Sequence, residues 1–279
     1  MRSCCRCLPV ILLVGIGVAG CVTDRPAPSD PVSGPVADAA LVSSDVVLVI
    51  DRSSVSLLAS GLDVDEDGVV GRTYSWVREG DSFPRPASSW TTDPDDTIHA
   101  LQLRVARALV PMLALRQNRV GLLSLTLRAK QQHFTLTRLI DQPAVVVPVG
   151  PPADVLAALE KLPPARERRR SDLARSLELA AEVLDAAAPA AGVARPRAIL
   201  LLSLGRPSAP GGIHWASQRA LEVARELGER GISVGAVPFG AADLDFLGKL
   251  TAVAGGSLVQ LDQLEARFGT PGARDPQSR

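Results

Sequence analysis

The chain has 279 residues, and its 30 lysines and arginines balance its 30 aspartates and glutamates, so the formal net charge at pH 7 is zero. This balance does not point to nucleic acid or to a strongly acidic partner. The four cysteines all lie near the amino terminus, at Cys4, Cys5, Cys7 and Cys21. The rest of the chain therefore has no disulfide framework, cysteine zinc site or catalytic thiol. The three histidines lie far apart, without the spacing of metal ligands.

The first twenty residues have the layout of a secretory signal peptide. Arg2 and Arg6 precede an apolar run, Leu8–Ala19, that is too short to span a bilayer. The run ends in Val-Ala-Gly-Cys, which resembles a bacterial lipobox, in which the cysteine is lipidated and becomes the first mature residue. Here that residue is Cys21, and Val22 follows it instead of aspartate, which implies delivery to the outer membrane. We therefore expect a protein that is lipid-anchored in the bacterial cell envelope.

The segment between the anchor and the folded part is rich in Pro, Ala, Ser and Asp and has no periodicity. Residues 21–43 are thus predicted to form the lipidated cysteine and a flexible tether. At the other end, residues 269–279 are predicted to be a disordered tail. A single folded domain is expected between them, over residues 44–268.

Apolar runs typical of strands alternate in this domain with segments of helical spacing. The predicted strands are Val46–Ile50, Val120–Thr126, Gln132–Leu139, Ala198–Ser203, Ile232–Phe239 and Ser257–Leu261. The predicted helices are Thr97–Leu115, Ala153–Leu162, Ser171–Ala188, Trp215–Gly231 and Asp243–Ala254. This alternation predicts an α/β fold: a doubly wound, mostly parallel six-stranded sheet with helices on both faces. Only Gln132–Leu139 alternates polar and apolar residues well, so we place it at an antiparallel edge.

The connection over residues 52–95 is unusually long and lacks periodicity, which is typical of a functional loop. Asp63, Asp65 and Asp67 stand at the first, third and fifth positions of a calcium loop, and Gly68 suits its turn. Val69 could add its backbone carbonyl. These residues form a candidate site for calcium or a similar cation; the alternative is an acidic surface turn.

The calcium-loop pattern is incomplete, because Tyr74 stands at the twelfth position instead of glutamate. Closure of the site would need another acid, such as Glu79, Asp81 or one of the cluster Asp93-Pro94-Asp95-Asp96. The alternative for that cluster is a set of acids at the amino end of the following helix.

The three tryptophans are expected at one face of the domain. Trp76 and Trp90 belong to the long loop, and Trp215 follows the fourth predicted strand. Aromatic side chains favour partner binding, so these residues are candidate contacts for a protein partner. The alternative is a small core within the loop that buries them.

Five motifs in order resemble those of a von Willebrand factor A domain, also called the integrin I-like fold. They are Val46–Asp51 followed by Ser53, Arg119–Ser124, Ser171-Asp172-Leu173-Ala174, Arg197–Leu202 and Ala254-Gly255-Gly256-Ser257. The resemblance covers residue 45 to about residue 265 and implies a Rossmann-like fold. It also implies a metal-ion-dependent adhesion site, where protein oxygens hold Mg²⁺ and a carboxylate of a partner protein completes the octahedron.

Carried over residue by residue, this adhesion site is degenerate. Asp51 and Ser53 match, and Ser171 keeps a hydroxyl at the threonine position. Val55 and Leu204 stand where the family has a hydroxyl and an acid. We therefore expect Mg²⁺ to bind poorly, with true metal-dependent adhesion as the alternative. In a related hypothesis an arginine pairs with the aspartate in place of the metal, the candidates being Arg52, Arg166, Arg168, Arg169 and Arg170.

These patterns favour a non-enzymatic adhesion module that binds an unidentified protein partner at the carboxyl edge of its sheet. An enzyme is disfavoured, because the chain has no G-x-S-x-G or Walker A motif, and because Asp51 with Ser53 lacks the base that a hydroxyl nucleophile needs. A structural surface scaffold with a decayed site is the remaining alternative. The cation is expected in the loop over residues 63–69 more than at the adhesion position.

Overall fold

The computed structural model describes residues 43–73, 91–133, 136–163, 171–187, 195–207 and 212–259. These residues form an α/β domain with a five-stranded sheet in the order β3-β2-β1-β4-β5. The strands are β1 Asp45–Ile50, β2 Arg119–His133, β3 Leu136–Gly150, β4 Arg197–Ser203 and β5 Ile232–Pro238. The helices are the 3₁₀ helix η1 Ser54–Leu57, then α1 Ile98–Leu115, α2 Pro152–Lys161, α3 Leu173–Ala186, α4 Ile213–Glu229 and α5 Leu244–Val253. All five predicted helices are present, with ends shifted by one or two residues.

The sheet is built around β1, which pairs in parallel with β2 on one side and with β4 on the other. β5 continues the parallel sheet beyond β4, whereas β3 pairs antiparallel with β2 at the opposite edge. All six residues of β1 are buried. A strand covered on both faces has to be apolar on both faces, which explains the continuous Val-Val-Leu-Val-Ile run of this strand. The predicted α/β class is thus confirmed.

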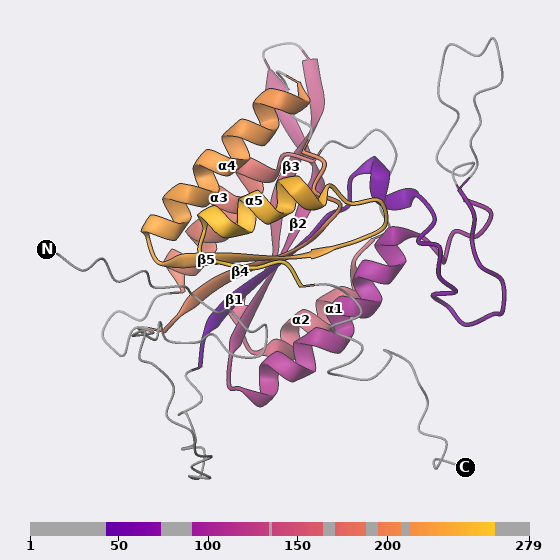
Figure 1. Cartoon of the computed structure of the whole chain (residues 1–279), viewed down its shortest axis with the longest axis horizontal. Helices are drawn as coiled ribbons and strands as arrows, with labels where there is room; N and C mark the ends of the chain where they lie inside the picture. The colour runs from indigo at the N-terminus through magenta and orange to yellow at the C-terminus, as the bar shows by residue number, and fades with distance from the viewer. Residues whose placement is uncertain are drawn as a thin grey trace, which may run out of the picture.

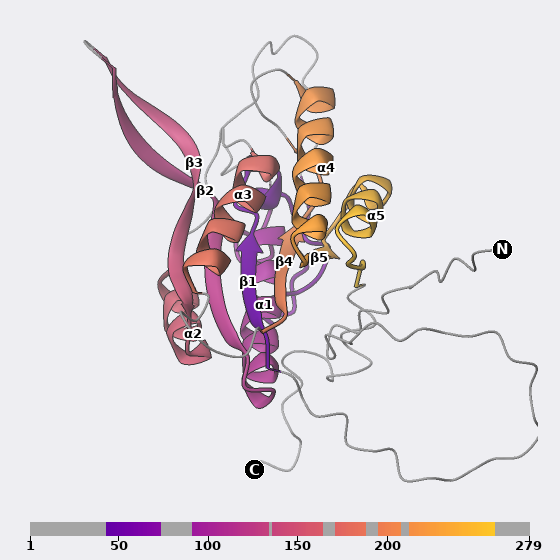
Figure 2. The same cartoon turned by 90° about the vertical axis from the view of Figure 1, so that its left-hand side faces the viewer.

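Helices cover both faces of the sheet (Figures 1 and 2). Val47 and Val49 of β1 point into a core formed with α3, α4 and α5. Leu48 and Ile50 point into a second core, formed with α1 and α2. Helix α1 is long and apolar enough by composition to cross a membrane. Its buried residues Leu101, Val105 and Leu109 belong to this second core.

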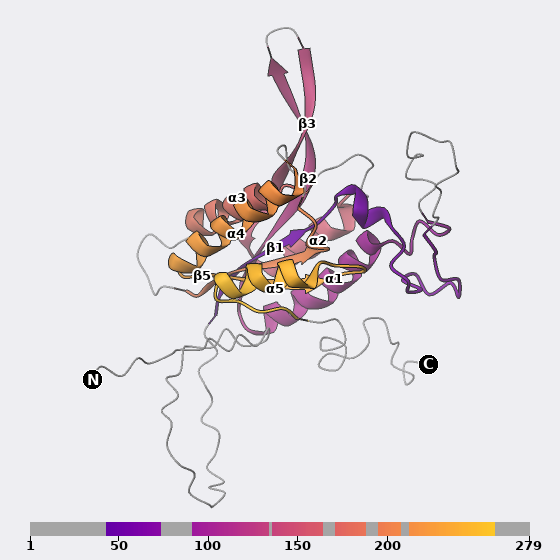
Figure 3. The same ribbon diagram turned by 45° about the horizontal axis from the view of Figure 1, so that its top comes forward.

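Three predicted strands differ from the structure. Val120–Thr126 is the first half of β2, which continues to His133. Gln132–Leu139 contains the end of β2 and the start of β3, which form a long hairpin (Figure 3). The antiparallel edge strand is therefore confirmed as β3, but its predicted bounds were wrong. Ser257–Leu261 does not form a sixth named strand among the described residues. Leu258 makes a single bridge to Ala236, and the chain is described only as far as residue 259.

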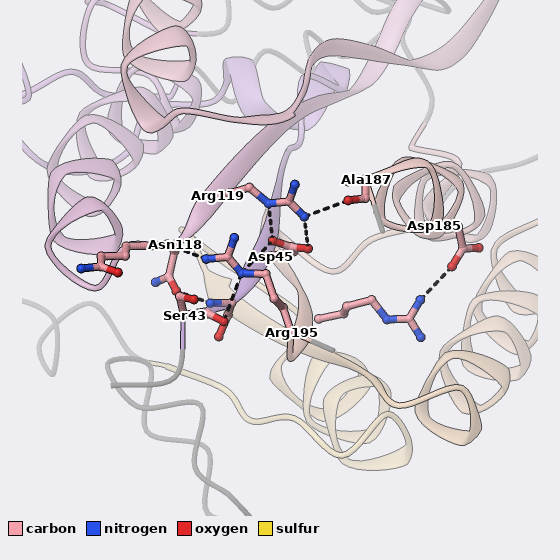
Figure 4. A network of polar contacts seen from close by, with 10 residues as sticks. Ser43, Asp45, Asn118, Arg119, Asp185, Ala187 and Arg195 are labelled. Atoms are coloured by element: carbon pink, nitrogen blue, oxygen red, sulfur yellow. Dashed lines mark hydrogen bonds and ion pairs between the residues drawn. The ribbon is translucent and has the colours of Figure 1, made fainter. Parts of the chain in front are cut away.

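A buried ion pair fixes the point where the chain enters the domain, at the amino end of β1 (Figure 4). Asp45 is 2% exposed and accepts two hydrogen bonds from Arg119, at 2.8 and 2.6 Å. Arg195 lies 3.8 Å from the same carboxylate and donates to the carbonyl of Ser43. The amide of Ser44 donates to Asn118 Oδ1 at 2.7 Å. The chain therefore enters at the amino ends of the parallel strands, and Asp51 lies at their carboxyl ends.

The predicted signal peptide, the lipidation residue Cys21 and most of the tether lie outside the described residues, as does the predicted tail over residues 269–279. Their boundaries remain predictions.

Candidate functional site

Asp51 follows β1 at the carboxyl edge of the sheet and is completely buried. Its Oδ1 accepts a hydrogen bond from the amide of Ser53 at 2.9 Å, and its Oδ2 accepts one from Ser203 Oγ at 2.9 Å. Burial raises the pKa of the Asp51 carboxyl, although the hydrogen bonds from Ser53, Ser203 and Leu204 act in the opposite direction. The carboxylate that the adhesion motif supplies is thus enclosed and bonded to protein groups.

The two hydroxyls of the predicted adhesion site are also buried. Ser53 and Ser171 are each 2% exposed, and neither Oγ makes a hydrogen bond to a described residue. The Ser53 side chain still lies near enough to lower the pKa of Asp51. Both hydroxyls therefore lie below the surface of the domain.

The two positions that lack a ligand oxygen are part of the core. Leu204 is 1% exposed and belongs to the cluster beneath α1 and α2. Val55, in η1, packs against the same cluster. Apolar contacts thus occupy the positions where the family's site has a hydroxyl and an acid.

Arg52 directly follows Asp51 and bonds a residue of β2. It is buried, and its Nη1 donates to Ser124 Oγ at 3.3 Å. The four other candidate arginines, at positions 166 and 168–170, lie outside the described residues. The hypothesis that an arginine replaces the metal therefore remains a hypothesis.

Sequence reasoning missed two buried polar residues near this edge, on the first turns of α1. His99 is 4% exposed, and burial together with the charge of Arg52 lowers its pKa to about 4. Gln102 is fully buried and donates from Nε2 to the carbonyl of Leu202 at 3.0 Å. Both fall on the apolar face of a helix, so the helical spacing alone could have indicated their burial.

The acidic loop brings its three predicted ligands together. Carboxylate oxygens of Asp63, Asp65 and Asp67 lie within 4.8 Å of one another. The loop closes on itself, because Gly68 donates its amide to Asp63 Oδ2 at 3.0 Å, and Val69 donates its amide to Asp67 Oδ1 at 2.7 Å. Asp63 Oδ1 is buried and has no hydrogen-bond partner among the described residues. A carboxylate oxygen in that state is suited to a cation.

Two acids from a distant part of the chain extend this cluster. Oxygens of Asp65, Asp93 and Asp95 also lie within 4.8 Å of one another. Asp65 is common to both groups, and partial desolvation and the charges of Asp67, Asp93 and Asp96 raise its pKa. The structure thus contains acidic groups that could hold a metal ion. Glu79 and Asp81 lie outside the described residues.

Exposed apolar side chains occur in several segments at the carboxyl edge of the sheet. Trp215 is 52% exposed at the start of α4. In the part of the chain that the structure describes, eight large apolar residues are exposed, and six of them lie in segments that follow β1, β4 or β5. These six are Leu62, Val69, Val70, Ile213, Trp215 and Leu244. Because the three strands are parallel, these segments share one edge of the sheet. The other two tryptophans that are candidate partner contacts, Trp76 and Trp90, lie outside the described residues.

Comparison with known proteins identifies the fold. The sequence matches no family model and no curated protein. In structure, the chain is similar to an aerotolerance-related membrane protein from Bacteroides fragilis, with a TM-score of 0.53, 13% identity, and coverage of 81% of this chain and 95% of that one. It is also similar to the von Willebrand factor A domain of SpRpn10, with a TM-score of 0.50, 12% identity, and coverage of 84% and 100%. The fold is that of a von Willebrand factor A domain.

The acidic loop and the adhesion position both follow β1. The resemblance assigns Asp51, Ser53 and Ser171 to that position, and the structure buries all three. The carboxylates of the loop are more accessible, since Asp65 and Asp67 are exposed. The two candidate metal positions of this von Willebrand factor A-like fold thus differ in their access to solvent.

Proposed function

We propose that this domain is a non-enzymatic protein-interaction module that binds its partner at the carboxyl edge of the sheet. The observation that carries the proposal is that six exposed apolar side chains lie in segments that follow β1, β4 or β5 at that edge. Exposed apolar groups next to polar ones are typical of binding surfaces. Trp215, Ile213 and Leu244 lie at the first turns of α4 and α5 and supply the apolar contacts.

The acidic loop binds a hard cation, with calcium as the best candidate. Support comes from Asp63, Asp65 and Asp67, whose oxygens converge. It also comes from the buried Asp63 Oδ1, to which no residue in the described ranges donates a hydrogen bond. Asp93 and Asp95 supply further oxygens of the kind that closure of the loop requires. Calcium takes six to eight oxygen ligands in flexible geometry, and weak affinity suffices outside the cell. The Val69 carbonyl, proposed from the sequence, would add one more ligand.

The adhesion position does not hold magnesium in this proposal. Asp51 is enclosed by hydrogen bonds to Ser53 and Ser203, and Val55 and Leu204 supply no oxygen. Mg²⁺ needs near-octahedral oxygen geometry with exchangeable positions, whereas this buried position offers one carboxylate and the hydroxyls of Ser53 and Ser171.

The domain is anchored in the bacterial envelope through lipid on Cys21 and is held away from the membrane by the tether. The ion pair between Asp45 and Arg119 supports this arrangement, because the tether enters at the amino edge of the sheet. The carboxyl edge then lies on the far side of the domain from the anchor. The similar protein from Bacteroides fragilis is itself described as a membrane protein, which agrees with an envelope location.

Affinity capture tests the proposal. The chain from residue 22 onward is immobilised and exposed to envelope extract, with calcium or with a chelator. We expect Trp215→Ala to lose a partner that Leu115→Ala retains. Leu115 is the matched control, because it is 83% exposed but lies at the carboxyl end of α1, away from the proposed binding edge. Chelator should weaken the capture. Absence of any partner, or equal loss with both variants, would leave the scaffold alternative in place of the proposed module.

A further inference from the structure

A buried carboxylate holds both arms of the acidic loop. Asp96 immediately precedes the cap of α1 and is completely buried. Its Oδ1 accepts the amide of Val64, and its Oδ2 accepts the amide of Gly71 at 2.6 Å. These two amides stand on either side of the run that contains Asp65 and Asp67. One side chain thus sets the distance between the ends of the loop.

The second arm is packed tightly against this carboxylate. A Cβ atom at Gly71 would lie 2.7 Å from the Cβ of Asp96 and 3.1 Å from that of Asp93. Real Cβ contacts are longer, so a side chain at this position would push the arm away. The glycine is therefore required for the close approach of the loop to Asp96.

Arg104 of helix α1 makes a second set of contacts to the loop. Its Nη1 donates to the carbonyl of Val64, and its Nη2 forms an ion pair with Glu66 Oε1 at 2.6 Å. Glu66 has a φ of 66°, which is a left-handed conformation that non-glycine residues rarely adopt. Glu66 stands in the middle of the acidic run, but its carboxylate is engaged by α1.

We infer that Asp96 and Arg104 are positioning residues that hold the acidic loop preformed, and that Glu66 is not a cation ligand. The inference rests on the proposed cation in this loop. A site that is already ordered before binding loses less conformational freedom when the cation arrives, which raises affinity. Partners of this kind, which orient the ligands without touching the metal, typically contribute ten- to a hundredfold to metal affinity.

The test is a calcium titration of the chain from residue 22 onward, by calorimetry, with a double-mutant cycle on Glu66 and Arg104. We expect Arg104→Met and Glu66→Gln to weaken calcium binding by similar factors, about tenfold, and the double variant to be no weaker than either. Asp96→Asn should weaken binding about tenfold or more, with the number of bound ions unchanged. Arg107→Met is the matched control, because Arg107 donates to the Leu159 carbonyl instead of the loop.

Two outcomes overturn the inference. If Glu66→Gln weakens binding as strongly in the Arg104→Met background as in the wild type, Glu66 binds the cation directly. If Asp96→Asn binds calcium like the wild type, Asp96 does not position the site.

Hydrogen exchange without calcium separates this inference from the proposed cation. The amides of Val64 and Gly71 should be protected in the wild type and should lose protection in Asp96→Asn. If these amides are protected but the wild type binds no calcium, the proposed cation site is wrong, and the positioning roles of Asp96 and Arg104 are still supported. Free exchange of both amides in the wild type contradicts the positioning roles.

Discussion

Ser203 Oγ donates a 2.9 Å hydrogen bond to Asp51 Oδ2, although the two residues are 152 positions apart in the chain. The same hydroxyl accepts the amide of Gly205 at 3.1 Å. A serine of β4 thus connects the carboxylate at the end of β1 to the turn that follows β4. Asp51, the aspartate on which the adhesion motif depends, is therefore already bonded to the side chain of Ser203.

We predict that Ser203→Ala lowers the free energy of unfolding by about 1–3 kcal/mol, because it leaves a buried carboxylate oxygen and the Gly205 amide without their partner. Urea unfolding measures this difference. Ser217→Ala is the matched control: Ser217 bonds the Ile213 carbonyl on the exposed side of α4, and its loss should change stability by less than about 0.5 kcal/mol. Equal effects of the two substitutions would show that the bond to Asp51 contributes nothing.

The ion pair between Asp45 and Arg119 predicts that replacing the two partners has unequal effects on the free energy of unfolding. Arg119→Met should cost about 3 kcal/mol, because it leaves the Asp45 carboxylate buried with only the more distant Arg195 nearby. Asp45→Asn should cost less, about 1–2 kcal/mol, because the Arg119 side chain is 32% exposed and can reach water. Unfolding free energies in urea compare the two variants. A larger cost for Asp45→Asn would contradict this account of the pair.

Gly255 and Gly256 are glycines for different physical reasons, the first for its backbone conformation and the second for lack of space. At Gly256, a Cβ atom would lie 1.9 Å from the carbonyl oxygen of Val234, so Gly256→Ala should prevent stable folding or lower the melting temperature sharply. Gly255 has a φ of 68° and open space around it, so Gly255→Ala should cost only about 1–2 kcal/mol. Thermal unfolding distinguishes them, and a Gly256→Ala variant as stable as Gly255→Ala would show that this turn is placed differently.

His99 should make the protein less stable in mild acid. Its pKa falls from 6.5 to about 4 on folding, so below pH 6.5 the unfolded chain takes up a proton that the folded chain refuses. Stability from this group is therefore complete above pH 6.5 and is lost as the pH falls toward 4, by up to about 1.4 kcal/mol per pH unit.

The raised pKa of Asp51 acts in the opposite direction, since the folded state favours the protonated carboxyl as the pH falls. The contribution of His99 is therefore isolated by comparing the wild type with His99→Gln between pH 7 and pH 4.5. The variant should lose less stability than the wild type over this range. His214→Gln, at an exposed residue of α4, is the control and should behave like the wild type. Parallel pH profiles for all three proteins would contradict the burial of His99.

Periodicity predicted the helices and the parallel strands because buried strands and amphipathic helices leave local patterns. It misplaced the β2–β3 hairpin, because the sequence around residue 134 has no glycine, proline or asparagine to indicate a turn. The alternation of Gln132–Leu139 therefore resembled one strand instead of parts of two.

The candidate site was less predictable than the fold, because its decisive contacts are long-range. Asp96 bonds the amide of Val64 across 32 positions and that of Gly71 across 25. The sequence offered Asp93, Asp95 and Asp96 as equal candidates to close the loop. Only the three-dimensional arrangement separates the first two, which converge with Asp65, from Asp96, which is buried and bonded to the backbone.

We propose that the cation site of this protein is the acidic loop and not the adhesion position. Calcium titration by calorimetry, with Asp65→Asn and Asp51→Asn as paired variants, tests it most directly. We predict that the wild type binds calcium, that Asp65→Asn loses most of this binding, and that Asp51→Asn keeps it. Binding that survives Asp65→Asn and disappears in Asp51→Asn would contradict the claim, as would a wild type that binds no calcium at millimolar concentration.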